Sequence, residues 1–357
     1  MSNRNLILLL AAAVVLGALT GLLYVGEEKS KPSFESGTPL VQGLPVEKVH
    51  RITINGSQNS VTLQRSGDSF VLAGKGSYPA AVKKVNNLLT SILDIRCKRK
   101  VTDSADNYAE LGVKKGASDA TVISFYNDSN KRLLSVIKGT KAKSSPGSYV
   151  RRSGEDTVYL TKSHVSVNSS PLDYVDKNLL SLSKDKIQQV SVKLKDKSYT
   201  LAPGDSGKAS LKNVPEGKQP VQSACDSVFS ALTNVRLQDI TKAGKLDLSW
   251  DGTYTCRMKN GLTYVVRTAK KDDAYYAKLS AKAANGDVKI TGTESEEKLK
   301  QKKKARKTAK KAQNLTQTHK GWVYKLAGWQ AKKLRKPLSD LVEKKTPDKI
   351  SARQILI

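Results

Sequence analysis

The three histidines are the side chains best suited to acid–base or metal chemistry near neutral pH. His50, His164 and His319 stand far apart in the sequence, and none lies in HExxH or another paired-ligand spacing. Histidine-based hydrolysis and zinc binding both need several such groups held together. We therefore expect neither a zinc site nor histidine catalysis, and we expect His50 to lie on a strand at the surface.

Other catalytic signatures are also missing from the sequence. It contains no GxGxxG or GxxxxGK[ST] phosphate-binding motif and no GxSxG nucleophile motif. Closely spaced carboxylates occur at Asp103 with Asp106 and at Asp272 with Asp273, in polar segments where Asp favours turns. We predict a protein that is not an enzyme, with no cofactor and no metal. An envelope enzyme remains the alternative, and it would need a concave cluster of acid, base and nucleophile.

The cysteines allow two interpretations. Cys97, Cys225 and Cys256 have no CxxC spacing, which argues against a redox motif. One interpretation is three buried free thiols. The other is a disulfide between Cys225, on a predicted helix, and Cys256, on a predicted strand.

Positive charge dominates the chain, with 62 Lys and Arg against 32 Asp and Glu and a formal net charge of +30. This charge predicts an anionic partner. The densest basic run lies between residues 296 and 313, and it is either a solvated helix or mobile loop, or an electrostatic arm. Such an arm would gain about 1 kcal/mol per basic residue near an anionic surface. The candidate contacts for an anionic ligand are Lys302, Lys303, Lys304, Arg306, Lys307, Lys310 and Lys311.

Aromatic residues near lysines at the end of the chain invite a nucleic-acid interpretation, in which bases stack on rings. Trp322 and Tyr324 share one strand face, and Trp329 begins a predicted closing helix over residues 329–344. We expect these three rings to form core instead, and we do not expect nucleic acid as a partner.

The N-terminal sequence predicts a membrane anchor. Residues 6–25 carry no charge, and about 20 helical residues match a hydrocarbon core of roughly 30 Å. A cleaved signal peptide is the alternative, although residues 17–21 make a poor cleavage site. We predict a cytoplasmic tip and transmembrane helix over residues 1–26, followed by a linker over 27–44. Arg4 before the span favours a cytoplasmic N-terminus and an extracytoplasmic body at the inner membrane.

Beyond the linker, local periodicity predicts strands and helices. Alternating apolar residues such as Ile52 and Ile54 predict short strands, and a 3.6-residue stripe over residues 82–92 predicts an amphipathic helix. Asn260 and Gly261 predict a type I′ hairpin within residues 253–267.

The order of these patterns repeats along the chain. Residues 48–54 (KVHRITI) are echoed by residues 186–192 (KIQQVSV), and residues 60–63 by residues 198–201. We predict an α+β fold in which the transmembrane helix precedes two tandem β-rich repeats, each an antiparallel meander with a packed amphipathic helix. The predicted boundaries are 45–184 for the first repeat and 185–350 for the second, with a Lys-rich insertion near 296–313.

Several short stretches of the sequence resemble those of one bacterial family. They are Asn3-Arg4 before a leucine-rich segment, GLPVEKV at residues 43–49, YPA at 78–80, YAELGV at 108–113, YVRR at 149–152 and GWVYKL at 321–326. The sequence is similar in these places to the family catalogued as domain of unknown function 4340. The resemblance implies an anchored envelope protein that accompanies a gliding-motility-type ABC transporter and its auxiliary protein. It supplies no catalytic residues.

We therefore expect a non-enzymatic, membrane-anchored accessory or assembly subunit of an ABC-type transport or envelope machine, acting outside the cytoplasm by protein–protein binding. The alternative is a binder of anionic envelope ligands, either lipid headgroups or acidic glycans, through the Lys-rich segment.

Overall fold

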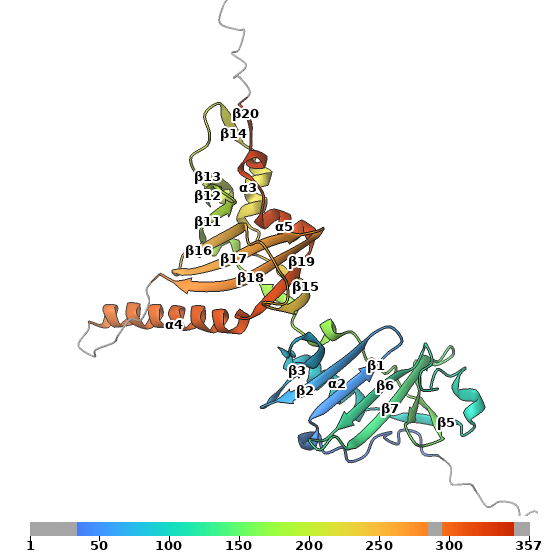
Figure 1. Ribbon diagram of the computed structural model, residues 1–357. Helices are drawn as coiled ribbons and strands as arrows, with labels where there is room; N and C mark the ends of the chain where they lie inside the picture. Colours follow the sequence, from blue (N-terminus) through green and yellow to red (C-terminus); the bar gives the residue numbers. More distant parts are fainter. Residues whose placement is uncertain (1–33, 285–294, 346–357) are drawn as a thin grey trace, which may run out of the picture. The chain divides into compact units, whose positions relative to one another are not determined.

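The computed structural model describes residues 34–284 and 295–345, which divide into two compact units (Figure 1). The first unit holds residues 34–59 and 86–169, and the second holds residues 60–85, 170–284 and 295–345. The predicted anchor over residues 1–26 lies outside the described residues. Among the described helices, none combines the length and the hydropathy that a membrane span requires.

Antiparallel strands make up the first unit. In space they follow the order β1-β6-β7-β8-β9-β5. Ile52 pairs with Phe125 and Ile54 with Ile123, and all four side chains are buried, as the alternation of the strand predicted. The strands are β1 (Arg51–Asn55), β5 (Cys97–Thr102), β6 (Thr121–Tyr126), β7 (Arg132–Lys141), β8 (Ser148–Arg152) and β9 (Val158–Thr161).

Part of the segment predicted as a linker packs against this unit. Leu40 and Val41 are buried, and the Leu40 amide donates to the carbonyl oxygen of Ile95 at 2.9 Å. Pro39 also forms an antiparallel bridge with Arg96. Packed structure therefore begins before the predicted domain boundary at residue 45, because the burial of Leu40 and Val41 stabilises this segment against the unit.

The second unit is built on a nine-stranded sheet with the order β10-β15-β19-β18-β17-β16-β11-β12-β13. These strands are β10 (Asn178–Leu180), β11 (Ile187–Leu194), β12 (Lys197–Pro203), β13 (Ala209–Leu211), β15 (Val235–Lys242), β16 (Gly252–Met258), β17 (Leu262–Lys271), β18 (Ala274–Ala283) and β19 (Trp322–Leu326). The same unit contains β2 (Ser60–Ser66), β3 (Ser69–Leu72) and β4 (Tyr78–Pro79), and the pair β14 (Lys218–Pro220) with β20 (Val342–Lys344).

Within the described residues, four α-helices accompany the strands, and short 3-10 turns lie between elements. The α-helices are α2 (Val82–Leu93), α3 (Gln222–Phe229), α4 (Glu296–His319) and α5 (Gly328–Leu334). The 3-10 turns are η1 (Val46–Lys48), η2 (Ala73–Lys75), η3 (Ala105–Tyr108), η4 (Pro171–Tyr174), η5 (Lys184–Lys186), η6 (Asp205–Gly207) and η7 (Leu338–Leu341). The described fold is thus mixed α+β with antiparallel sheets.

Helix α2 matches the helix predicted over residues 82–92. Val85, Leu88 and Ile92 of its apolar stripe are buried, whereas Val82 at its first position is exposed. The helix predicted over residues 329–344 is wrong in extent. It is replaced by α5, η7 and β20, because Pro337 cannot continue a helix and the chain then extends to pair with β14.

Candidate anion-binding groove

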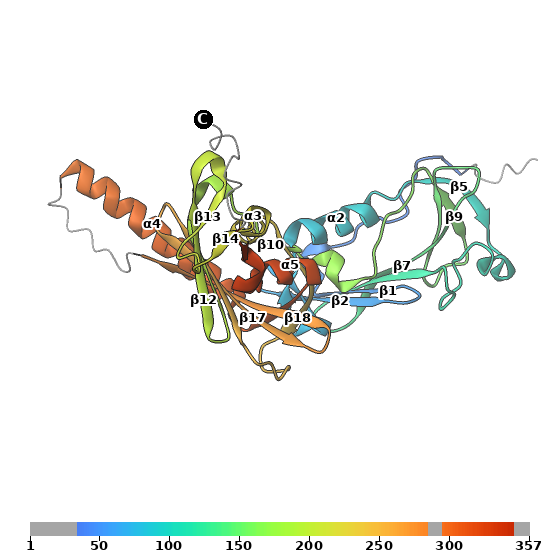
Figure 2. The ribbon, with the colours of Figure 1, turned by 90° about the horizontal axis from the view of Figure 1, so that it is seen from above.

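Helix α4 carries the basic run, so the run is a 24-residue helix and not a loop. Its composition of Ala, Lys, Glu and Gln has high helix propensity, and Glu296 and Glu297 in the first turn favour the N-terminal end of the helix dipole. Figure 2 shows the first turns of α4 extending beyond the strands. The helix ends at His319, six residues beyond the predicted insertion, just before β19.

Small side chains hold α4 against the sheet. Thr308 and Ala312 are buried on the helix face that contacts β18 and β17. Strand β18 pairs with β19 only over Tyr275–Ala277, so the rest of that strand edge needs another cover. Helix α4 provides it, and Thr316 bonds to both backbone polar groups of Ala281.

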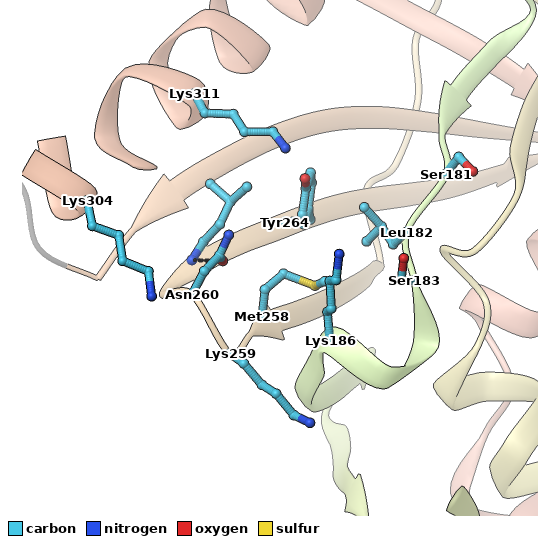
Figure 3. A pocket seen from close by; sticks show the side chains of 11 residues that line it. Ser181, Leu182, Ser183, Lys186, Met258, Lys259, Asn260, Tyr264, Lys304 and Lys311 are labelled. Carbon is cyan, nitrogen blue, oxygen red and sulfur yellow. Dashed lines mark hydrogen bonds between the residues drawn. The ribbon is translucent and has the colours of Figure 1, made fainter. Parts of the chain in front are cut away.

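A groove of about 380 Å³ lies between α4, the β16–β17 turn and the segment that leads into β11 (Figure 3). Four lysines line it: Lys186 from η5, Lys259 from the turn, and Lys304 and Lys311 from α4. The other lining residues are Ser181, Leu182, Ser183, Met258, Asn260, Leu262 and Tyr264. None of these described lining residues carries a carboxylate.

Different local rules place these lysines in one groove. Lys304 and Lys311 are seven residues apart, so two helical turns put them on the same side of α4. Lys186 and Lys259 meet because β11 pairs with β16, and the Lys259 amide donates to the carbonyl oxygen of Lys186 at 2.9 Å. The groove is therefore assembled from three segments that are separate in the sequence.

The β16–β17 turn differs from the predicted type I′ hairpin. A hairpin is present, but only Gly261 of the Asn260-Gly261 pair has a positive φ, of 81°, whereas type I′ requires it at both positions. The Gly261 amide donates to the carbonyl oxygen of Met258, which leaves Lys259 and Asn260 at the tip of the turn. This wider turn is what presents Lys259 to the groove.

Only part of the predicted basic contact set reaches the groove. Lys304 and Lys311 line it, whereas Lys303 and Lys310, each one residue earlier, point away from it by about 100° around the helix. Lys302, Arg306 and Lys307 do not line it either. The sequence alone does not point to Lys186 and Lys259, because each reaches the groove through strand pairing across about 70 residues of chain. The hairpin signal at Asn260-Gly261 was the only local hint.

Buried partners hold two of the histidines. The Nδ1 atom of His319 lies 2.6 Å from the Tyr324 hydroxyl, and burial lowers the pKa of His319 to about 4. The Nδ1 atom of His164 lies 2.9 Å from Ser148 Oγ, a pairing that superficially resembles a base and nucleophile. Ser148 is fully buried, however, and its Oγ also accepts the Val165 amide at 3.3 Å. The pair therefore ties the segment at His164 and Val165 to strand β8.

The cysteines are free and buried, in keeping with the first of their two interpretations. Burial raises the pKa of Cys97 to about 11 and that of Cys256 to about 12, so both stay protonated at neutral pH. Within residues 34–284 and 295–345, no group of three or more His, Cys, Asp or Glu side chains is placed to hold a metal ion.

Of the three aromatic rings expected to form core, Tyr324 is fully buried, Trp322 is half-buried and Trp329 is exposed. Trp329 is 59% exposed, because it occupies the second position of α5 on the side away from buried Ala331 and Leu334. The ammonium group of Lys333 lies 5.2 Å from the centre of its ring. This cation–π contact, one turn along the helix, covers part of the ring.

A family model described as "Domain of unknown function (DUF4340)" matches residues 71–249, about half of the 357-residue chain. No curated protein and no solved structure matches the chain.

Proposed function

Because the chain belongs to the family described as a domain of unknown function (DUF4340), whose name assigns no activity, we propose a function from the groove. The protein is a non-enzymatic binding protein, and its second unit holds an anionic partner between α4 and the β16–β17 turn. We propose further that it serves as an accessory or assembly subunit of an ABC-type transport or envelope machine.

The observation that carries this proposal is the convergence of Lys186, Lys259, Lys304 and Lys311 on one groove. Ammonium groups on one lining repel each other unless an anion lies between them, and no carboxylate among the described lining residues offsets them. Leu182, Met258, Leu262 and Tyr264 add apolar surface to the lining. The four lysines are exposed, so their attraction for a negatively charged group weakens as salt is added.

The cellular setting is also a proposal. The uncharged residues 6–25 support a single membrane span with the body of the chain outside the cytoplasm. The accessory role is supported by the resemblance set out above. A second candidate function uses the same groove, in which the four lysines bind an anionic envelope ligand such as a lipid headgroup or an acidic glycan.

We also propose that the two units arose by duplication of one module. The strand order β1-β6-β7-β8-β9-β5 of the first corresponds position by position to β11-β16-β17-β18-β19-β15 of the second. The registers correspond as well, since Ile52 pairs with Phe125 and Val190 with Cys256, all four buried. Experimental structures of the two units in which these six strands fail to superpose in order would refute the duplication.

A crosslinking pull-down of the tagged full-length protein from its native membranes tests the binding function. The proposal expects transporter subunits to be recovered with a protein whose N-terminal peptide, residues 1–25, is intact. The double variant Lys304→Glu/Lys311→Glu should lose this recovery. The control Lys303→Glu/Lys310→Glu makes the same charge change on the exposed side of the same helix and should retain it. Equal recovery with both variants would reject the groove as the binding site.

A further inference from the structure

A second hollow of about 250 Å³ adjoins the lysine-lined groove. Asn260 and Lys304 line both, so the two hollows meet at the side chain of Lys304. The remaining lining residues of the second hollow are Gly261, Ala283, Ala284, Gln301, Ala305 and Thr308. Together the hollows form a cleft that follows α4 past the tip of the hairpin.

The chemistry changes along this cleft. The first hollow has four lysines around an apolar floor, whereas the second has Lys304 as its one charged side chain among described lining residues that are otherwise small or neutral. The small side chains of Gly261, Ala283, Ala284 and Ala305 leave the second hollow open. A ligand that fills both hollows is therefore elongated, anionic at one end and uncharged at the other.

We propose that the ligand is an extended acidic segment of a partner protein, which crosses Lys304 and occupies both hollows. This inference rests on the proposed binding function and names its ligand class. Carboxylates of the segment meet the lysines, and small residues of the same segment pass between Ala284 and Ala305. Side-chain amides at Asn260 and Gln301 are placed to bond the polar backbone of that passing segment.

Two observations favour a polypeptide over a single phosphate group. The cleft is longer than one compact anion, since it has two hollows on either side of Lys304. Its cationic groups are all lysines, which act as separate point charges, and the described lining offers no arginine for two-pronged phosphate binding. Spaced carboxylates on one extended strand suit such an arrangement.

The turn geometry makes the cleft a fixed feature. Asn260 Oδ1 accepts the Leu262 amide at 3.1 Å, which orients the Asn260 side chain. The Ala284 amide donates to the carbonyl oxygen of Gly261 at 2.9 Å and ties the end of β18 to the turn. Since Thr308 and Ala312 anchor the facing helix, both walls are positioned before any ligand binds.

The test measures fluorescence anisotropy of a labelled peptide of about eight residues with the full-length protein in detergent. The peptide carries four Asp or Glu residues followed by Gly and Ala, and its analogue has Gln and Asn in place of the acids. We expect the acidic peptide to bind and the analogue to bind at least about tenfold more weakly. Lys304→Glu/Lys311→Glu should weaken the binding of the acidic peptide by a similar factor. The control Lys303→Glu/Lys310→Glu should weaken it by less than about twofold.

A second variant separates the peptide from a phosphate-bearing ligand. Ala284 directly follows β18 and is exposed, so Ala284→Leu should fold normally while its larger side chain narrows the second hollow. The substitution should weaken the binding of the acidic peptide several-fold and leave the binding of inorganic phosphate and of phosphatidylglycerol vesicles unchanged. The inference is overturned if Ala284→Leu leaves the binding of the acidic peptide unchanged, or if phosphatidylglycerol vesicles bind the groove and the peptide does not. In either case the pull-down above still reports independently on the binding function.

Discussion

The Thr316 hydroxyl makes two hydrogen bonds with Ala281, accepting from its amide nitrogen and donating to its carbonyl oxygen, both at 2.9 Å. Through this pair a helix side chain takes the place of a neighbouring strand at the open edge of β18. The groove exists because α4 is held at this edge, so the stability of the helix–sheet contact can be tested separately from binding.

Thr316→Val should loosen α4 without changing the volume of the side chain. We expect a loss of about 2 kcal/mol in the free energy that holds the helix to β18, since each net hydrogen bond contributes about 1 kcal/mol. Amide hydrogen exchange along α4 and β18 measures this loss directly. Thr318→Val is the control, because the exposed Thr318 hydroxyl bonds only to Asn314 within the helix. Equal protection in both variants would contradict the role of Thr316.

His319 should make the second unit sensitive to acid. Its folded pKa, about 4, lies below the ordinary value of 6.5, so the unfolded chain takes up a proton first as the pH falls. Stability is then full above pH 6.5 and declines as the pH falls toward 4, by up to about 2 kcal/mol after allowance for partial exposure.

Urea unfolding of the wild type and of His319→Gln at pH 7.5 and pH 5 measures this decline. The wild type should lose more stability between the two values than the variant, because Gln does not titrate. Parallel losses in the two proteins would show that His319 is not the group responsible.

The three thiols should be unreactive in the folded protein. Cys97, Cys225 and Cys256 are all buried, and burial raises each pKa. We expect reaction with a thiol reagent to be slow in buffer and complete in urea, with three thiols counted per chain. A mass 2 Da lower for a linked pair of peptides containing Cys225 and Cys256 would instead establish a disulfide.

The ion pair between Arg335 and Asp251 should contribute strongly to the second unit. Arg335 donates to both carboxylate oxygens, at 2.7 and 2.8 Å, and also to Thr268, and the hydrogen bond from Arg335 lowers the pKa of Asp251. Arg335→Lys loses the two-pronged contact and should cost about 1–3 kcal/mol in chemical unfolding. Arg152→Lys, in an exposed pair with Glu155, should cost far less. Similar losses in the two variants would argue against a special role for Arg335.

Local patterns in the sequence were sufficient to predict several elements. The alternation at Ile52 and Ile54 and the stripe that includes Val85 and Leu88 depend only on neighbours along the chain, and the structure contains β1 and α2 there. The closing helix beyond Trp329 was wrong because Pro337 outweighed the spacing of the leucines.

Two of the four groove lysines could not be predicted from the sequence, because their place in the groove depends on strand pairing. Lys304 and Lys311 belong to an obvious basic run, but Lys186 and Lys259 are single lysines in ordinary segments. They reach the groove only through the register in which Ile187 pairs with Met258. A hydrophobic pattern predicts that a strand exists, whereas its partner in the sheet is set by contacts far away in the sequence.

The most direct test of the groove as the binding site is photocrosslinking in native membranes. A photoreactive residue at Ser183, which lines the groove, is compared with one at Lys303 on the exposed side of α4. We predict a discrete protein adduct from position 183 that disappears when Lys304→Glu/Lys311→Glu is added, and no such adduct from position 303. An adduct from position 303 alone, or one from position 183 that survives the two substitutions, would contradict the account.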